Sequence, residues 1–408
     1  MKRKITFTLC IWIALCSLAQ TQQGLVKTIG RPGKPGTPLG NVTIRWRGEV
    51  NSVVSGADGS FSVIMTGKKN GDPESALESC LKALEMRERS LGPNHPDVAS
   101  SHSTIGAIYE SMRDYKSALQ HYNKSLEIRL KAFGPEHPDV ATSYNNIGVV
   151  YAGMGDYAKA QKYYDQALAI LEKSPDANPI LMAQTYNNIG NFHYNQEQYE
   201  KALECHNKAL DIFRRLNMQD RIDVSNTYSD MGEVYSALGD DDKALELLNR
   251  ALDIRERMLG KDDVKVAASH ENMAMVYVHQ QDYEQALEHQ LLALNIRENT
   301  QDKDPLDLAT TYNNLGVIYG GLEDYEKGLE YHFKALQIRE KELGADDPST
   351  ITVCNNISVC YANQGNYSMA LEYAHKVLSY YEKAYGPDDP YTLKRKKYIE
   401  EIQQMMGQ

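Results

Sequence analysis

Residues 134–171 read GPEHPDVATSYNNIGVVYAGMGDYAKAQKYYDQALAIL, and this stretch decides the fold. Two sets of residues in it are spaced by three and four, as on one helix face: Tyr144, Ile147, Gly148 and Tyr151, then Ala160, Tyr164, Ala167 and Leu168. The glycines between the two sets predict a turn, because glycine accepts positive φ. The prolines that follow Gly134 predict the start of the first helix, with Asp139 as its N-cap. The stretch therefore predicts a helix hairpin.

The same pattern recurs every 42 residues along most of the chain. One column is leucine in every row: Leu84, Leu126, Leu168, Leu210, Leu252, Leu294, Leu336 and Leu378. A second column is almost all small: Gly106, Gly148, Gly190, Gly232, Ala274, Gly316 and Ser358. Residues 93–386 hold seven such rows without insertion or deletion. Since one hairpin cannot bury its apolar face alone, the rows are expected to stack into a solenoid.

The spacing of Tyr144, Gly148 and Ala160 resembles the tetratricopeptide pattern, W-x2-L-G-x2-Y followed by A-x3-F. The usual repeat has about 34 residues, and the additional ones here lie between one hairpin and the next. This longer unit is similar to the repeats of kinesin light chains and related bacterial proteins. The resemblance implies an all-α, right-handed superhelical solenoid of helix hairpins.

The two ends of the repeat array depart from the pattern, as capping repeats do. Residues 73–92 match only the second helix of a hairpin, and residues 387–408 predict a closing helix with Leu393 and Ile402 turned inward. Residues 20–72 alternate apolar and polar side chains, which indicates strands. This β-rich segment resembles a truncated carboxypeptidase-regulatory-like module of exported Bacteroidetes-type proteins.

Residues 1–19 have the pattern of a secretory signal peptide. Three basic residues precede an apolar run that is too short to span a membrane, and Ser17 and Ala19 suit a signal-peptidase site. We expect cleavage there, no transmembrane span in the mature chain, and a location in the periplasm or cell envelope. An uncleaved N-terminal anchor is the alternative. Four cysteines remain, Cys80, Cys205, Cys354 and Cys360; buried free thiols are favoured over disulfides, and their state stays open.

Composition and motifs argue against catalysis and against nucleic acid. The formal net charge of −11 disfavours phosphate contacts. Neither Gly-Lys pair is followed by Ser or Thr as a P-loop requires, and the zincin-like start at His270 has Ala274 where the second ligand belongs. We therefore expect no enzyme activity, no cofactor, no metal site and no small-molecule substrate. A column of arginines late in the second helix indicates structural ion pairs: Arg87, Arg129, Arg255, Arg297 and Arg339.

Two adjacent columns of the first helix are rich in asparagine, which is a mediocre helix former. The asparagine column is Thr104, Asn146, Asn188, Asp230, Asn272, Asn314 and Asn356. The neighbouring column is Ser103, Asn145, Asn187, Ser229, Glu271, Asn313 and Asn355. Because an amide both donates and accepts hydrogen bonds, such a row can satisfy an extended peptide backbone. The resemblance to kinesin light chains implies this role, and the alternative is that these amides join neighbouring helices.

Positions one turn further along the same helix differ from row to row, which favours a role in specificity. They are Val149, Asn191, Glu233, Met275, Val317 and Val359, the variable column, and then Gly153, Asn195, Ala237, His279, Gly321 and Asn363. The asparagine column lacks the Lys and Arg with which related proteins hold a terminal carboxylate. We expect a protein-binding adaptor whose concave groove takes an extended segment of a partner. The alternative is a structural or sensory scaffold of an envelope signalling system, acting through its outer face or its N-terminal module.

Overall fold

A computed structural model describes residues 43–45, 52–55, 61–64, 73–174, 178–300 and 303–407. The chain divides into two compact units, Met1–Asp176 and Ala177–Gln408. The first contains α2 (Pro73–Leu91), α3 (Pro96–Ser111), α4 (Tyr115–Phe133), α5 (Pro138–Gly153) and α6 (Tyr157–Lys173). The second contains α7 (Pro179–Tyr194), α8 (Tyr199–Arg215), α9 (Ile222–Ala237), α10 (Asp241–Leu259), α11 (Val264–His279), α12 (Tyr283–Asn299), α13 (Pro305–Gly321), α14 (Tyr325–Glu342), α15 (Pro348–Asn363), α16 (Tyr367–Tyr385) and α17 (Pro390–Met406).

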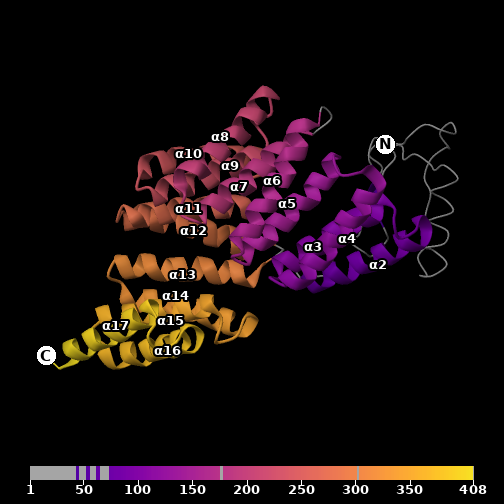
Figure 1. Ribbon diagram of the computed structural model, residues 1–408. Coiled ribbons are helices and arrows are strands. Elements are labelled where there is room, and N and C mark those ends of the chain that lie inside the picture. The colour runs from indigo at the N-terminus through magenta and orange to yellow at the C-terminus, as the bar shows by residue number, and fades with distance from the viewer. Residues whose placement is uncertain are drawn as a thin grey trace. The chain divides into compact units, whose positions relative to one another are not determined.

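Within each unit, consecutive helices pair as hairpins and pack in sequence order (Figure 1). The tandem all-α arrangement predicted for the repeats is confirmed. The start of α5 differs from the prediction, because His137 rather than Asp139 is the N-cap. The His137 ring nitrogen Nδ1 accepts a hydrogen bond from the Asp139 backbone N–H at 3.2 Å. Pro138 then occupies the first helical position, where its fixed φ suits a helix and its missing N–H is not needed.

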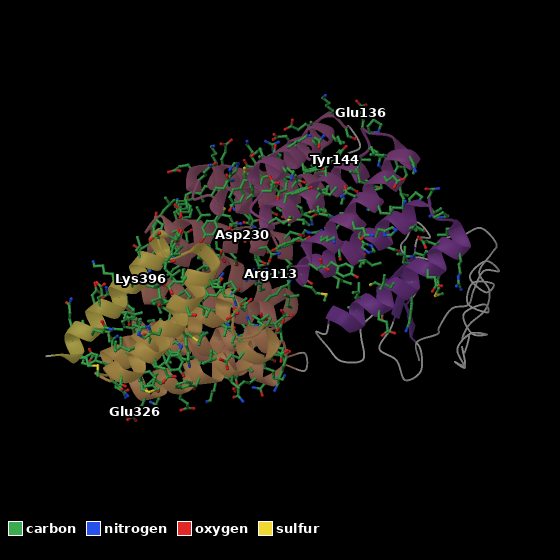
Figure 2. The ribbon with its side chains drawn as sticks, turned by 60° about the horizontal axis from the view of Figure 1, so that its bottom comes forward. Arg113, Glu136, Tyr144, Asp230, Glu326 and Lys396 are labelled. Atoms are coloured by element: carbon green, nitrogen blue, oxygen red, sulfur yellow. The ribbon has the colours of Figure 1, made fainter. Side chains whose placement is uncertain are left out.

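The turn inside each hairpin places one residue in the left-handed region. Gly155 has φ of 76° there, as expected for glycine. Arg113, labelled in Figure 2, has φ of 58° at the equivalent position of the first repeat, and Glu323 has 61°. The hairpin geometry therefore imposes this conformation even where the sequence supplies no glycine.

The core is formed where the two helices of a hairpin approach each other. A Cβ added at Gly148 would lie 2.8 Å from the Tyr164 ring, and one at Gly316 would lie 2.5 Å from the His332 ring. Ala160 and Ala167 are fully buried beside them. Tyrosines of the first helix pack against the second, as where Tyr151 stacks on Tyr163 with ring centroids 5.5 Å apart. The small columns thus let large partner side chains fill the space between helices.

Side chains of the arginine column connect one hairpin to the next, mostly through hydrogen bonds rather than ion pairs. Arg129 donates to the backbone carbonyl of Asp139 at 3.1 Å and to the Ser143 hydroxyl at 2.9 Å. Arg297 contacts the carboxylates of Glu271 and Asp307. The predicted ion pairing therefore holds at Arg297. At Arg129 the guanidinium instead donates to a backbone carbonyl and a hydroxyl in the first turns of α5.

Three short strands precede the repeat helices, and α17 follows them. Strands β1 (Thr43–Arg45), β2 (Ser52–Ser55) and β3 (Phe61–Ile64) pair antiparallel in the order β1-β2-β3. The rest of the predicted β-rich segment and the predicted signal peptide lie outside the described residues. In α17, Ile402 is buried as predicted, whereas Leu393 is 50% exposed. That prediction was wrong because the inward face of α17 runs through Thr392 and Ile399, one helix position away from Leu393.

Candidate functional site

In the second unit, the first helices of successive hairpins contact one another directly. These contacts join α7 to α9, α9 to α11, α11 to α13, and α13 to α15. When a stack of helices curves, the helices on its inner side lie closer together than those on its outer side. The first helices therefore line the inner side of this unit, and we call α7, α9, α11, α13 and α15 the A layer.

The asparagine column follows the A layer with one residue on each helix. These residues are Asn188, Asp230, Asn272, Asn314 and Asn356, and Asn146 occupies the equivalent place on α5 of the first unit. All six side chains are half-buried, so that each is held by neighbours yet reaches solvent. Half-buried amides at regular spacing have the accessibility that a backbone-binding role requires.

Several residues of the asparagine column bond to the preceding A-layer helix. Asn272 Nδ2 donates to Glu233 Oε1 at 2.9 Å, and Asn191 Nδ2 donates to Asp230 Oδ2 at 3.3 Å. Asn356 Nδ2 donates to Asn313 Oδ1 at 3.0 Å. The side chains of this column are thus partly ordered before any ligand binds. This reduces the conformational entropy that they would lose on binding.

The neighbouring column turns toward the packed interior of the stack. Asn145 is 5% exposed. Asn187 donates to Thr227 Oγ1 at 2.7 Å and contacts the His206 ring at 3.2 Å. Asn355 accepts from Arg395 at 3.2 Å. Asn313 accepts from Asn356, and Glu271 pairs with Arg297. The stack therefore buries Asn145 and forms hydrogen bonds with Asn187, Asn313 and Asn355. The predicted contact of these four amides with a peptide stays a prediction.

Two carboxylates lie side by side in the A layer on α9. Asp230, labelled in Figure 2, is half-buried, whereas the side chain of Glu233 reaches solvent. Burial, and then the charge of Glu233, raise the pKa of Asp230 to about 7. Burial also raises the pKa of Glu233, although its hydrogen bond from Asn272 and the nearby Arg255 oppose this effect. The pair forms a site where an added cation would relieve electrostatic repulsion.

Farther along the A layer the variable column becomes apolar. Met275 on α11 and Val359 on α15 are 40% and 39% exposed, and Val317 on α13 is half-buried. Nearby, His279 contacts the carboxylate of Asp241 at 2.9 Å. The chemistry of the variable column therefore changes from amide and acid on α7 and α9 to apolar on α11, α13 and α15.

An open hollow of about 430 Å³ in the second unit has Tyr228 of α9 and Arg250 of α10 in its wall. The Arg257 guanidinium there contacts Asp220 at 2.8 Å and Asp253 at 3.0 Å, so these charges are already matched. Within the described ranges, no three His, Cys, Asp or Glu side chains gather as a metal site would need. None of the helices among those residues has the length and apolar character to cross a bilayer.

Solved structures of other proteins share this architecture. BtubC (BKLC) from P. vanneervenii is 23% identical, with a TM-score of 0.50 over 56% of this chain and 92% of that chain. A structure from Podosopora anserina, described as a kinesin light chain with nearly identical TPR-like repeats, is 17% identical, with a TM-score of 0.43 over 51% and 98%. The quorum sensor NprR from B. thuringiensis is 15% identical, with a TM-score of 0.52 over 80% and 79%. BtubC and NprR show a shared fold.

Comparison with curated proteins gave no match. The sequence pattern of the tetratricopeptide repeat family matches at residues 68–131, 103–173, 181–257, 265–327 and 307–383. Together these ranges cover most of the chain and coincide with its helix hairpins. This chain therefore belongs to the tetratricopeptide repeat family.

Proposed function

We propose that this chain is a non-catalytic adaptor that binds an extended segment of a partner protein along the inner side of its helix stack. In the second unit the contacts would come from Asn188, Asp230, Asn272, Asn314 and Asn356, and Asn146 is the equivalent residue of the first unit. The observation that carries the proposal is that all six are half-buried at equivalent places on successive hairpins. Tetratricopeptide repeats are typical of protein-protein interaction, which supports this class of function.

The spacing of the helices suits a peptide backbone. An extended chain advances about 3.3 Å per residue, and packed helices lie about 8–10 Å apart. About every third peptide unit would therefore meet the amide of the next A-layer helix. Because a carboxamide can donate to a carbonyl and accept from an N–H, the contact does not depend on the side chains of the segment.

The side chains of the segment would be selected by the variable column. A basic residue suits the carboxylates of Asp230 and Glu233, whose repulsion it would relieve. Apolar residues suit Met275, Val317 and Val359, where burial of exposed apolar surface is favourable. The proposed ligand is therefore an extended segment with a basic residue at one end and apolar residues toward the other.

The proposed place of action is the periplasm or cell envelope, and this part of the proposal rests on the sequence of residues 1–19. N-terminal sequencing of the mature protein tests it, with a start at Gln20 expected. A start at Met1 would overturn cleavage of a signal peptide.

Affinity capture from an envelope extract tests the binding site. The baits are the mature chain and a variant in which Asn146, Asn188, Asn314 and Asn356 are all changed to Ala. Exposed asparagines on the second helices offer a matched control, because each donates to a backbone carbonyl in its own helix: Asn123, Asn207, Asn249 and Asn299. Changing those four to Ala removes the same number of side-chain amides from the second helices of the hairpins.

The expected result is a partner that is held by the wild type and by the control variant but is lost by the folded variant of the asparagine column. Circular dichroism of each bait establishes that it has folded. Equal capture by all three baits would overturn the proposed site. It would favour the alternative function, a scaffold in envelope signalling that acts through its outer face or its N-terminal segment.

A further inference from the structure

Two hairpins each contain a pair of histidines that face each other between the two helices. In the first unit, Nδ1 of His102 on α3 lies 3.0 Å from Nδ1 of His121 on α4. In the second unit, Nδ1 of His270 on α11 lies 2.9 Å from Nδ1 of His289 on α12. Each pair has its nitrogen-bearing edges turned toward each other across a helix hairpin.

The two pairs are one arrangement built twice by equivalent rows of the repeat. Their ring centroids are 5.1 and 5.2 Å apart. The second ring of each pair also lies against a tyrosine, Tyr109 in one case and Tyr277 in the other, with both centroid distances at 5.5 Å. Other rows hold two tyrosines at these positions, as in Tyr144 with Tyr163. The histidines thus replace a packing pair without changing the surrounding helices.

The chemistry of facing imidazole nitrogens differs from that of a packing pair. When both rings are neutral, one Nδ1–H donates to the other Nδ1. If the donor ring instead carries its proton on Nε2, two lone pairs face the same small space. Neutral imidazole nitrogen is a preferred ligand of Zn²⁺ and Cu²⁺. The exchange of tautomer leaves both rings neutral, so that an ion could bind with no net release of protons from the pair.

We propose that each histidine pair chelates one borderline divalent transition ion, Zn²⁺ or Cu²⁺, through its two Nδ1 atoms. In tetrahedral geometry with metal–nitrogen bonds of about 2.05 Å, the two nitrogens lie about 3.3 Å apart and the ring centroids about 5.1 Å apart. The centroid distances already match this value, so the rings need only pivot in place to open the nitrogen–nitrogen distance by a few tenths of an ångström.

Access and charge set the expected strength of the two sites. His102 and His270 are each 8% exposed, while His121 and His289 are half-buried, so water can fill the remaining coordination positions. With two protein ligands the ion should be bound reversibly rather than as a structural metal. The expectation from sequence that the chain has no metal site would then be incomplete, because it sought three converging ligands.

The second pair should bind the ion more tightly than the first. Lys124 lies close enough to His102 to act on it by charge, and it would repel a metal cation. The negative charge of Glu288 acts on His289 in the opposite sense, and it would attract a metal cation. In the hairpin of the second pair, the residue equivalent to Lys124 is Leu292. The chain therefore supplies its own control, since Lys124→Leu should raise the affinity of the first pair toward that of the second.

Calorimetric titration of the untagged full chain with ZnCl₂ tests the proposal. Two ions per chain are expected, with one lost in His121→Tyr, another lost in His289→Tyr, and none bound when both are changed. Tyrosine is chosen because the chain itself uses it at this position in other rows. His375→Gln is the matched control, because His375 is an exposed histidine outside both pairs.

A spectroscopic readout separates ligation from a change in folding. Zn²⁺ should shift the ¹⁵N resonances of Nδ1 in the four paired histidines and leave their Nε2 protonated. If either Tyr variant fails to fold by circular dichroism, His121→Gln and His289→Gln replace it. No binding up to millimolar Zn²⁺, or binding that persists in the folded double variant, would overturn the proposal.

Discussion

Adjacent residues of one helix, Glu271 and Asn272, perform different tasks. Glu271 is 7% exposed and pairs with Arg297, which joins the hairpins of the stack. Asn272 is half-buried and reaches the neighbouring A-layer helix through Glu233. Since successive residues of a helix are turned by about 100°, a single position separates the interior of the stack from its inner surface. The same difference in burial separates Asn145 from Asn146 and Ser229 from Asp230.

Glu271→Ala should have the largest effect on stability. It leaves the Arg297 guanidinium in a buried place without its buried partner, and breaking such a pair costs about 3–5 kcal/mol. Asn272→Ala removes one hydrogen bond at a half-buried position and should cost about 0.5–1.5 kcal/mol. Chemical denaturation of both variants measures the difference. Equal losses would contradict the division between the two columns.

Two glycines of α13 offer a second contrast, between a packed position and an open one. A Cβ at Gly316 would lie 2.5 Å from the His332 ring, so Gly316→Ala should destabilise by about 1–3 kcal/mol. Nothing lies within 4 Å of the corresponding atom at Gly320. Gly320→Ala should therefore stabilise the helix by about 0.5–1 kcal/mol. Thermal melts of the two variants should shift in opposite directions, and parallel shifts would show that the packing contact does not govern stability here.

Asp230 should make the free energy of unfolding depend on pH. Its pKa of about 7 is above the usual value of an unfolded aspartate, about 3.9. The folded state therefore keeps a proton that the unfolded state has lost, and stability falls as pH rises from about 4 to about 7. Because the carboxylate reaches solvent, we expect a loss of about 1–2 kcal/mol between pH 5 and pH 8.

Asp230→Asn removes this titration while keeping a side chain of the same shape. The stability difference between wild type and variant should therefore change with pH, in favour of the variant at pH 8. Unfolding curves at both values measure it. A difference that is the same at pH 5 and pH 8 would contradict the raised pKa of Asp230.

Much of the fold could be predicted from sequence because the same residue spacing recurs in seven rows. An atypical residue in one row therefore does not hide the pattern. The spacing of Tyr144, Gly148 and Ala160 predicts a hairpin, and its recurrence predicts the stack. Finer details depended on contacts that periodicity does not encode. The helix start at His137 was decided by the proline at the first helical position. The exposure of Leu393 was decided by which face of the last helix meets α16.

The candidate site was predictable only in part. The columns identify which residues share a helix face, but the two asparagine-rich columns look alike in sequence. The burial of Glu271 next to the half-buried Asn272 distinguishes the packed side of the helix from the open one. The histidine pairs were also missed. Their signal was present, since two rows carry histidine at both positions of a pair that other rows fill with tyrosine.

The most direct test of the account is the affinity of the captured partner segment, as a synthetic peptide, for the two asparagine variants. The variant changed at Asn146, Asn188, Asn314 and Asn356 should lose three or four hydrogen bonds to the peptide backbone, each of about 0.5–1.5 kcal/mol. Its binding should therefore be weaker by about a hundredfold. The control variant, changed at Asn123, Asn207, Asn249 and Asn299, should bind as wild type does. Equal affinity for all three proteins would contradict the claim that the asparagine column holds the peptide backbone.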